Sequence, residues 1–236
     1  MKKCAFIIPY FGKFNNYFQL FLNSCKYNQD YDWLIFTDDK TQYDYPENVK
    51  VQYTTFKWLE NLIREKLDIM PHIQDMHKIC DFKPAYGLIF EDYLKDYDFW
   101  GHCDCDLIFG NLNDFLTDEL LLEYDKIFTQ GHCILYKNVS DVNKAFMLEL
   151  NDKRIYKDIL EDSKTLAFDE EYLPNNVNQI FIQNKFKVFE QDYSANISRK
   201  HGDFRIVHFD PLIRNYLEEE KQKSLYVWDK GQLLRF

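Results

Sequence analysis

The 236-residue sequence has no long apolar run, no cysteine framework and no surplus of positive charge. No run approaches the length of a membrane-spanning helix, and the apolar stretch before Pro9 is too short for the core of a secretion signal. The six cysteines are scattered, without a disulfide-like pattern or the paired spacing of a zinc site. We therefore expect a cytoplasmic protein whose cysteines are reduced, small core residues.

The net charge and the absence of repeats and linkers further narrow the class of protein. A net charge of −10 argues against nucleic acid as a partner, because phosphate backbones are bound by a surplus of Lys and Arg. A local basic patch would still allow peripheral association with the inner face of a membrane. There is no internal repeat or low-complexity linker, so we expect one domain over residues 1–236.

The first half of the chain alternates between short apolar runs and helical periodicity. The pattern predicts strands at 4–8, 33–37 and 49–53 and around 99–100, and helices at 15–27, 56–67 and 82–94, the last beginning at Pro84. This alternation predicts an α/β fold with an open, mostly parallel sheet flanked by helices on both faces.

The second half has shorter elements. It predicts helices at 112–124, 139–150, 178–184 and 215–223, and strands at 126–129, 132–136, 185–189 and 205–211. The polar segment 151–173 is interpreted as an excursion over the ligand cleft.

A pair of carboxylates, Asp104 and Asp106, follows the central strand. Residues two apart in an extended chain point the same way, so both carboxylates can face one cation. Such hard oxygen donors suit Mg²⁺ or Mn²⁺. Only this pair lies between apolar runs, where carboxylates buried without a cation would be costly. The same spacing, which an aspartate-rich chain produces by chance, recurs at Asp30/Asp32 and Asp96/Asp98.

Other strand ends also carry polar or turn residues. The turn that begins at Pro9 and Tyr10, the Asp38 carboxylate and the Asp104/Asp106 pair are all expected at the carboxyl edge of the sheet, where α/β proteins bind ligands. Asp38 either binds a nucleoside or caps its strand. Lys83 either contacts a diphosphate or is a solvated lysine at a helix start.

An acidic triplet, 169–171, supplies candidates for the chemistry. Asp169 and Glu170 follow an apolar run and are assigned as a general base for an acceptor hydroxyl or a contact to a donor sugar. The alternative is a solvated surface face, the usual place for an acidic triplet.

Four segments together resemble a known family. They are Ile-Ile-Pro-Tyr-Phe-Gly at 7–12, Phe-Thr-Asp-Asp at 36–39, Cys-Asp-Phe-Lys-Pro-Ala-Tyr-Gly at 80–87 and Trp-Gly-His-Cys-Asp-Cys-Asp at 100–106. The chain resembles small bacterial glycosyltransferase-like proteins of capsule and lipopolysaccharide gene clusters, within the GT-A class of nucleotide-sugar transferases. The resemblance covers residues 1–140, and more loosely the region of His208 and the segment 231–234.

The resemblance implies a GT-A-like, Rossmann-type sheet, a Mn²⁺ or Mg²⁺ ion and a nucleoside-diphosphate sugar as donor. It implies a metal site of Asp104, Asp106 and His208, a nucleotide-binding half at 1–110, and an acceptor and metal-completing half at 111–236. Pro9, Tyr10, Asp38, Lys83 and Asp104 are the expected nucleotide contacts.

The predicted activity is metal-dependent transfer of a sugar, with a UDP-sugar as the favoured donor, to a saccharide or lipid-linked saccharide acceptor in surface polysaccharide synthesis. Two alternatives stay open. A nucleotidyltransferase would also use paired carboxylates, but needs two metal ions and usually a third carboxylate or a glycine-rich phosphate loop, and no such loop is visible. A non-catalytic carbohydrate-binding protein would instead recognise glycans through the abundant aromatic side chains, which form 18% of the chain.

Overall fold

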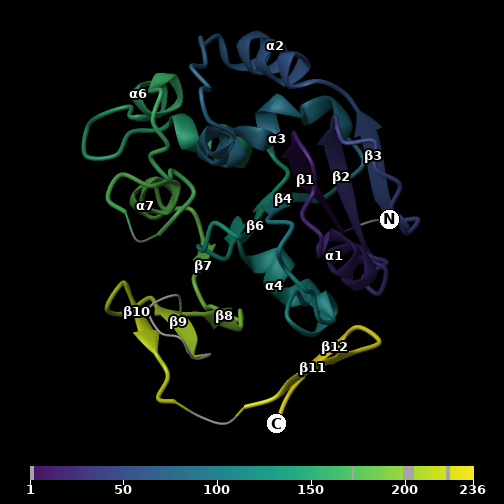
Figure 1. Cartoon of the computed structure of the whole chain (residues 1–236). Helices are drawn as coiled ribbons and strands as arrows, with labels where there is room; N and C mark the ends of the chain where they lie inside the picture. Colours follow the sequence, from purple (N-terminus) through teal and green to yellow (C-terminus); the bar gives the residue numbers. More distant parts are fainter. Residues whose placement is uncertain (1–2, 172, 199–204, 222–223) are drawn as a thin grey trace.

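The centre of the molecule is a seven-stranded sheet (Figure 1), seen in a computed structural model that describes residues 3–171, 173–198, 205–221 and 224–236. Its strand order is β3-β2-β1-β4-β6-β5-β7. The strands are β1 (Cys4–Tyr10), β2 (Tyr31–Thr37), β3 (Val49–Tyr53), β4 (Phe99–Cys103), β5 (Lys126–Ile127), β6 (Cys133–Lys137) and β7 (Val188–Phe189). All neighbours pair in parallel except β6, which is antiparallel to β4 and β5. The predicted α/β class, with a mostly parallel sheet flanked by helices, is confirmed.

Helices cover both faces of this sheet (Figure 1). Successive side chains of β1 point to opposite faces, so Phe6 joins the core under α1 (Phe18–Cys25) and α4 (Asp118–Glu123). Ile7 joins the core under α2 (Phe56–Leu67), α3 (Tyr86–Ile89), α6 (Tyr156–Glu161) and α7 (Val177–Gln183). Each fully buried side chain of this size stabilises the fold by about 1.5–3 kcal/mol.

The strand order reverses direction beside β1. From β1 the chain continues through β2 and β3 on one side, whereas β4 pairs with β1 on the other side. A reversal of this kind opens a crevice between the loops at the carboxyl ends of the two strands, which is where open α/β sheets bind ligands. The loops after β1 and β4 border this crevice.

The C-terminal residues form two small antiparallel units, drawn at the bottom of Figure 1. One is the three-stranded sheet of β8 (Asn196–Ile197), β9 (Ile206–Asp210) and β10 (Asn215–Glu218). The other is the hairpin of β11 (Tyr226–Asp229) and β12 (Gln232–Arg235). Trp228 of the hairpin donates a hydrogen bond from Nε1 to the Phe109 carbonyl at 2.8 Å, which joins the hairpin to the loop after β4.

Several predicted helices are wrong in type or extent. The helix expected at 82–94 is a 3₁₀ helix, η1 (Met76–Ala85), then α3 and a second 3₁₀ turn, η2 (Glu91–Tyr93), so Pro84 lies inside η1 and does not begin a helix. Residues 112–124 contain η3 (Leu112–Asp114) and α4, and residues 139–150 contain α5 (Ser140–Asn143) and η4 (Ala145–Met147).

The helix expected at 215–223 is also wrong, because residues 215–218 form β10. The alternating exposure of this strand follows the two-residue period of a chain that pairs with β9. The end of that prediction, 222–223, and residue 172 of the predicted 151–173 excursion lie outside the described residues.

Candidate functional site

The Asp104/Asp106 pair lies at the carboxyl end of β4. The extended backbone expected here is wrong, because Cys105 and Asp106 form a turn immediately after the strand. The Asp104 amide donates to the His132 carbonyl at 2.9 Å, which ties this turn to the loop before β6. The Asp104 side chain is 41% exposed and Asp106 is exposed. Both carboxylates therefore stand at the surface end of a buried strand.

Lys83 joins Asp104 to the acidic triplet. Its ammonium lies 2.9 Å from Asp104 Oδ1 and 3.0 Å from Asp169 Oδ2, and it donates to the Gly131 carbonyl at 2.8 Å. A lysine ammonium has three protons, and here three acceptors surround it. Burial lowers the pKa of Lys83, but the Asp169 and Asp104 carboxylates raise it more, so the net shift is well above the ordinary value. Lys83 is thus a fixed positive charge and not the solvated lysine of the alternative.

Asp169 and Glu170 are brought to this site by a close approach to Gly131. A Cβ at Gly131 would lie 2.6 Å from Asp169 Oδ2 and from Glu170 Oε1, so only glycine leaves room for both carboxylates. Burial raises the pKa of Asp169, although Lys83 partly offsets the shift. Burial, and then the Asp169 charge, raise the pKa of Glu170 to about 7. The triplet is therefore part of a buried charge cluster and not a solvated face.

The polar ends of β1 and β2 are bonded to each other. Gly12 has a φ of 95°, in the left-handed region that favours glycine, and its amide donates to Asp38 Oδ1 at 2.8 Å. Tyr10 stacks on Phe14 with ring centroids 4.3 Å apart. Pro9 and Tyr10 are half-buried, whereas Asp38 is exposed. Asp38 thus caps the β1 turn, and its assignment as a nucleoside contact stays a prediction.

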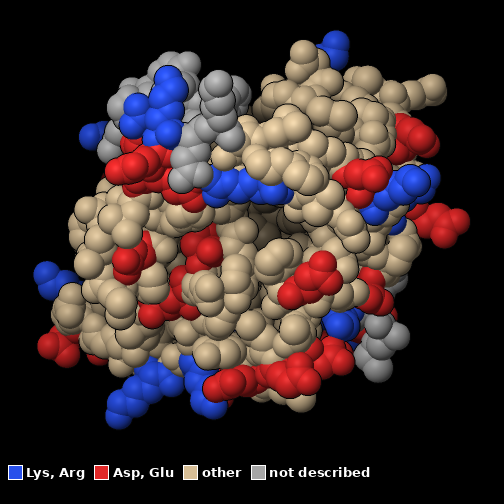
Figure 2. Space-filling model, turned by 90° about the horizontal axis from the view of Figure 1, so that it is seen from below, with Lys and Arg blue, Asp and Glu red and all other residues tan. Residues whose placement is uncertain are grey.

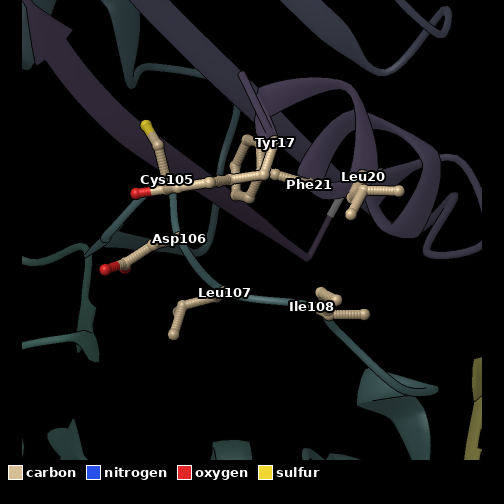
Figure 3. Close-up of a pocket in the computed structure, with 7 residues that line it drawn as sticks. All are labelled: Tyr17, Leu20, Phe21, Cys105, Asp106, Leu107 and Ile108. Carbon is tan, nitrogen blue, oxygen red and sulfur yellow. The ribbon is translucent and has the colours of Figure 1, made fainter. Parts of the chain in front are cut away.

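A cavity of about 300 Å³ lies where the chain after β1 meets the turn after β4 (Figure 3). It is lined by Tyr17, Leu20, Phe21, Cys105, Asp106, Leu107 and Ile108. In Figure 3 the Asp106 carboxylate points away from Leu20 and Ile108, so the interior is mostly apolar. The Tyr17 hydroxyl accepts a hydrogen bond from the Asn15 side chain at 2.7 Å. The sequence does not predict this cavity, because its walls come from two segments 84 or more positions apart. They meet only once α1 is packed on the sheet.

Residues of the small C-terminal sheet contact neighbours of the charge cluster. Arg214, between β9 and β10, pairs with Glu171, and Tyr216 of β10 donates to the side chain of Gln130. His208 Nε2 lies 2.8 Å from Glu219 Oε1. Within the described residues, no group of three or more His, Cys, Asp or Glu side chains is placed to hold a metal ion. The role of His208 as a third ligand stays a prediction.

The donor set nevertheless suits one class of metal site. Asp104 and Asp106 supply hard carboxylate oxygens at the edge of the sheet, and Lys83 reaches only the Oδ1 atom of Asp104 in the contact described above. Mg²⁺ in phosphate-handling proteins is bound through one or two carboxylates together with substrate phosphates and water. Two exposed carboxylates therefore fit an ion shared with a diphosphate, and do not require a complete protein cage.

The face seen from below in Figure 1 is hollowed near its centre (Figure 2). Asp and Glu side chains lie on several sides of the hollow, and Lys and Arg side chains border it along one edge. The overall charge of −10 is thus not spread as a uniform acidic surface on this face. None of the helices in the described part of the chain has the length and apolar character needed to cross a membrane.

The chain belongs to a protein family of unknown function, DUF6625, whose model matches residues 6–236. No curated protein matches the chain. Among solved structures, it is similar to the glycosyltransferase GlyE of Streptococcus pneumoniae TIGR4, with 17% identity and a TM-score of 0.32. The match covers 70% of this chain and 45% of that one, so this chain spans less than half of that structure. Neither the family nor this similarity assigns a function to the chain.

Proposed function

We propose that this protein is a metal-dependent glycosyltransferase that uses a nucleoside-diphosphate sugar, with a UDP-sugar as the first candidate. The observation that carries the proposal is the charge cluster at the carboxyl end of β4. There Lys83 lies within 3.0 Å of both Asp104 and Asp169, beside the crevice at which the strand order reverses. This cluster thus combines three kinds of group: carboxylates that can bind a cation, a fixed ammonium, and a carboxyl group with a raised pKa.

Asp104 and Asp106 are the residues that would hold Mn²⁺ or Mg²⁺, with His208 as a third ligand from β9. When bound, such an ion supplies Lewis-acid stabilisation of the negative charge that develops on a leaving diphosphate. The Lys83 ammonium adds a positive charge beside Asp104, in a position where burial weakens its screening by water. Its cluster of acceptors keeps it oriented before substrate binds.

The donor's nucleoside fits the cavity between α1 and the turn after β4. Its apolar walls and the exposed ring of Tyr17 suit a flat, stacking group, and Asp106 in its wall connects it to the carboxylate pair. In this arrangement Pro9 and Tyr10 border the same edge of the sheet. Asp38 contributes chiefly by fixing the turn at Gly12.

Glu170 is our candidate for the general base. Its pKa of about 7 is near the optimum for accepting a proton from an acceptor hydroxyl at neutral pH. Asp169, which pairs with Lys83 at 3.0 Å, would contact the donor sugar. The acceptor is a saccharide or lipid-linked saccharide, and surface polysaccharide synthesis at the inner face of the membrane is the process that would use it.

A screen of nucleotide sugars for hydrolysis and transfer tests this proposal. Purified protein is incubated with UDP-, GDP-, CMP- and dTDP-sugars, with Mn²⁺ or with excess chelator, and the released nucleotide is measured. We expect release from one nucleotide class, only with the ion, and its loss in Asp106→Asn. Glycan binding without any nucleotide release would favour the carbohydrate-binding alternative, and pyrophosphate release from a nucleoside triphosphate would favour a nucleotidyltransferase.

A further inference from the structure

The backbone that leads into Asp169 is fastened by a fully buried ion pair. Lys78 and Asp81 of η1 are 0% exposed, with Lys78 Nζ 2.8 Å from Asp81 Oδ2. The Lys78 ammonium also donates to the carbonyls of Ile159 at 2.6 Å and Lys164 at 2.9 Å. All three ammonium protons therefore have an acceptor, which is the condition for burying this charge.

Asp81 completes the attachment with its two oxygens. Oδ2 accepts from the Leu166 amide at 2.9 Å, and Oδ1 accepts from the Phe168 amide at 3.0 Å. Side chains three residues apart eclipse one another in a 3₁₀ helix, so the unusual form of η1 places Lys78 directly beside Asp81. Lys83, in the same helix, contacts Asp169 itself. One rigid element thus holds residues 159–168 and the carboxylate that follows them.

The two amides held by Asp81 flank a residue in an unfavourable conformation. Ala167 has a φ of 52°, in the left-handed region that residues with a Cβ seldom adopt. Such a conformation persists when its surroundings over-determine it, and it is concentrated at functional sites. The Glu170 amide donates to the Ala167 carbonyl at 3.0 Å, so the turn made at Ala167 directly sets the path of the backbone into Asp169 and Glu170.

We propose that Asp81 is a positioning residue, which clamps the left-handed turn at Ala167 and thereby holds Asp169 and Glu170 against Gly131. Asp81 itself contacts neither donor nor acceptor and acts through the backbone of Leu166 and Phe168. The catalytic part of this inference rests on the proposed glycosyl transfer, whereas the clamp itself does not.

The test is Asp81→Asn, which keeps the shape of the side chain but removes its charge and one acceptor oxygen. Hydrogen exchange at the Leu166 and Phe168 amides should become faster, while the amides of β1 stay protected. The rate of donor turnover should fall about 100-fold, as expected for a displacement of about 1 Å at a reacting group. The donor KM should change much less than the turnover rate, because the diphosphate and the nucleoside are bound at Asp104, Asp106 and the cavity beside α1, away from the displaced carboxylates. Asp75→Asn is the matched control, since Asp75 is the exposed N-cap of the same helix and Asn caps equally well.

A second variant guards against simple unfolding, because Asp81→Asn leaves the Lys78 ammonium buried beside a neutral partner. Lys78→Met/Asp81→Asn removes both charges and should fold, with the same fast exchange and slow turnover. Adding Ala167→Gly, which accepts a positive φ without strain, should restore part of the turnover.

Retained protection of the Leu166 and Phe168 amides in both variants would overturn the clamp. Lost protection with unchanged turnover would overturn the positioning role. If the wild-type protein turns over no nucleotide sugar, the proposed function fails, while the exchange measurements still decide whether Asp81 holds the turn.

Discussion

Replacing Lys83 by Met removes the positive charge that lies between the Asp104 and Asp169 carboxylates. The side chains of Lys83 and Asp169 are 10% and 2% exposed, so Met fills a similar volume but leaves the Asp169 carboxylate buried without its cation. Asp104 is affected less, because 41% of its side chain is exposed and water can solvate it. The main consequence therefore falls on Asp169.

Removing one partner of a buried ion pair typically costs about 3–5 kcal/mol of unfolding free energy. Asp169 can reduce that cost by taking up a proton. Burial already raises its pKa, and Lys83 is the main influence that lowers it, so the Lys83→Met change raises it further. A carboxyl group whose pKa is higher in the folded than in the unfolded state stabilises the fold at low pH, and this stabilisation is lost as pH rises through the folded-state pKa. The Lys83→Met change should thus lower the free energy of unfolding more at pH 8 than at pH 5.

Urea unfolding at pH 5 and pH 8 measures both effects. Lys66→Met is the matched control, since Lys66 also contacts two carboxylates, Glu91 at 2.9 Å and Asp92 at 2.8 Å, but these are 49% and 58% exposed. Exposed pairs of this kind contribute about 0–1 kcal/mol. Equal losses for the two lysines, or a Lys83→Met loss that does not grow with pH, would refute the assignment of Lys83 and Asp169 as a buried charge pair.

Two further changes probe the same cluster. If Glu170 is the base, turnover should rise with pH through about 7 and then level, because the deprotonated form accepts the proton, and Glu170→Gln should give a low rate with no such rise. A rise that persists in Glu170→Gln would assign the titration elsewhere. Gly131→Ala should slow turnover about 100-fold without weakening UDP binding. The added Cβ would lie 2.6 Å from an oxygen of Asp169 and of Glu170, so both carboxylates would have to move away. Gly110→Ala is its control, because a Cβ there meets no atom closer than 3.6 Å, and equal rates in the two variants would contradict the prediction.

The central strands were predictable because they are buried on both faces. The apolar runs at 4–8 and 33–37 lie within β1 and β2, whose residues are almost all buried, and the amphipathic period at 56–67 coincides with α2. Thr55 precedes α2 and accepts from the Trp58 amide, so local capping and the hydrophobic pattern agree on where this helix begins. Where both signals were absent, as at 215–218, the helix prediction was wrong.

The meeting of Lys83, Asp169 and Gly131 could not be predicted from local patterns. These contacts join residues 38 to 86 positions apart, and they depend on η1, whose 3₁₀ period the helical pattern does not reveal. Lys78 and Asp81 stand three positions apart in a segment of mixed polarity, and this spacing alone does not indicate a buried pair. The sequence could therefore indicate candidate residue types, which stay predictions, while their grouping needed the tertiary fold.

The central claim is that Asp104 and Asp106 bind a nucleotide through a divalent ion. Titration calorimetry of the protein with UDP, in Mn²⁺ and in excess chelator, tests it most directly. Asp96→Asn, in the exposed Asp96/Asp98 pair, is the control for Asp106→Asn. We predict heat of binding only with Mn²⁺, retained in Asp96→Asn and lost in an Asp106→Asn protein that still folds. Equal affinity for UDP in chelator, or unchanged binding in Asp106→Asn, would contradict the claim.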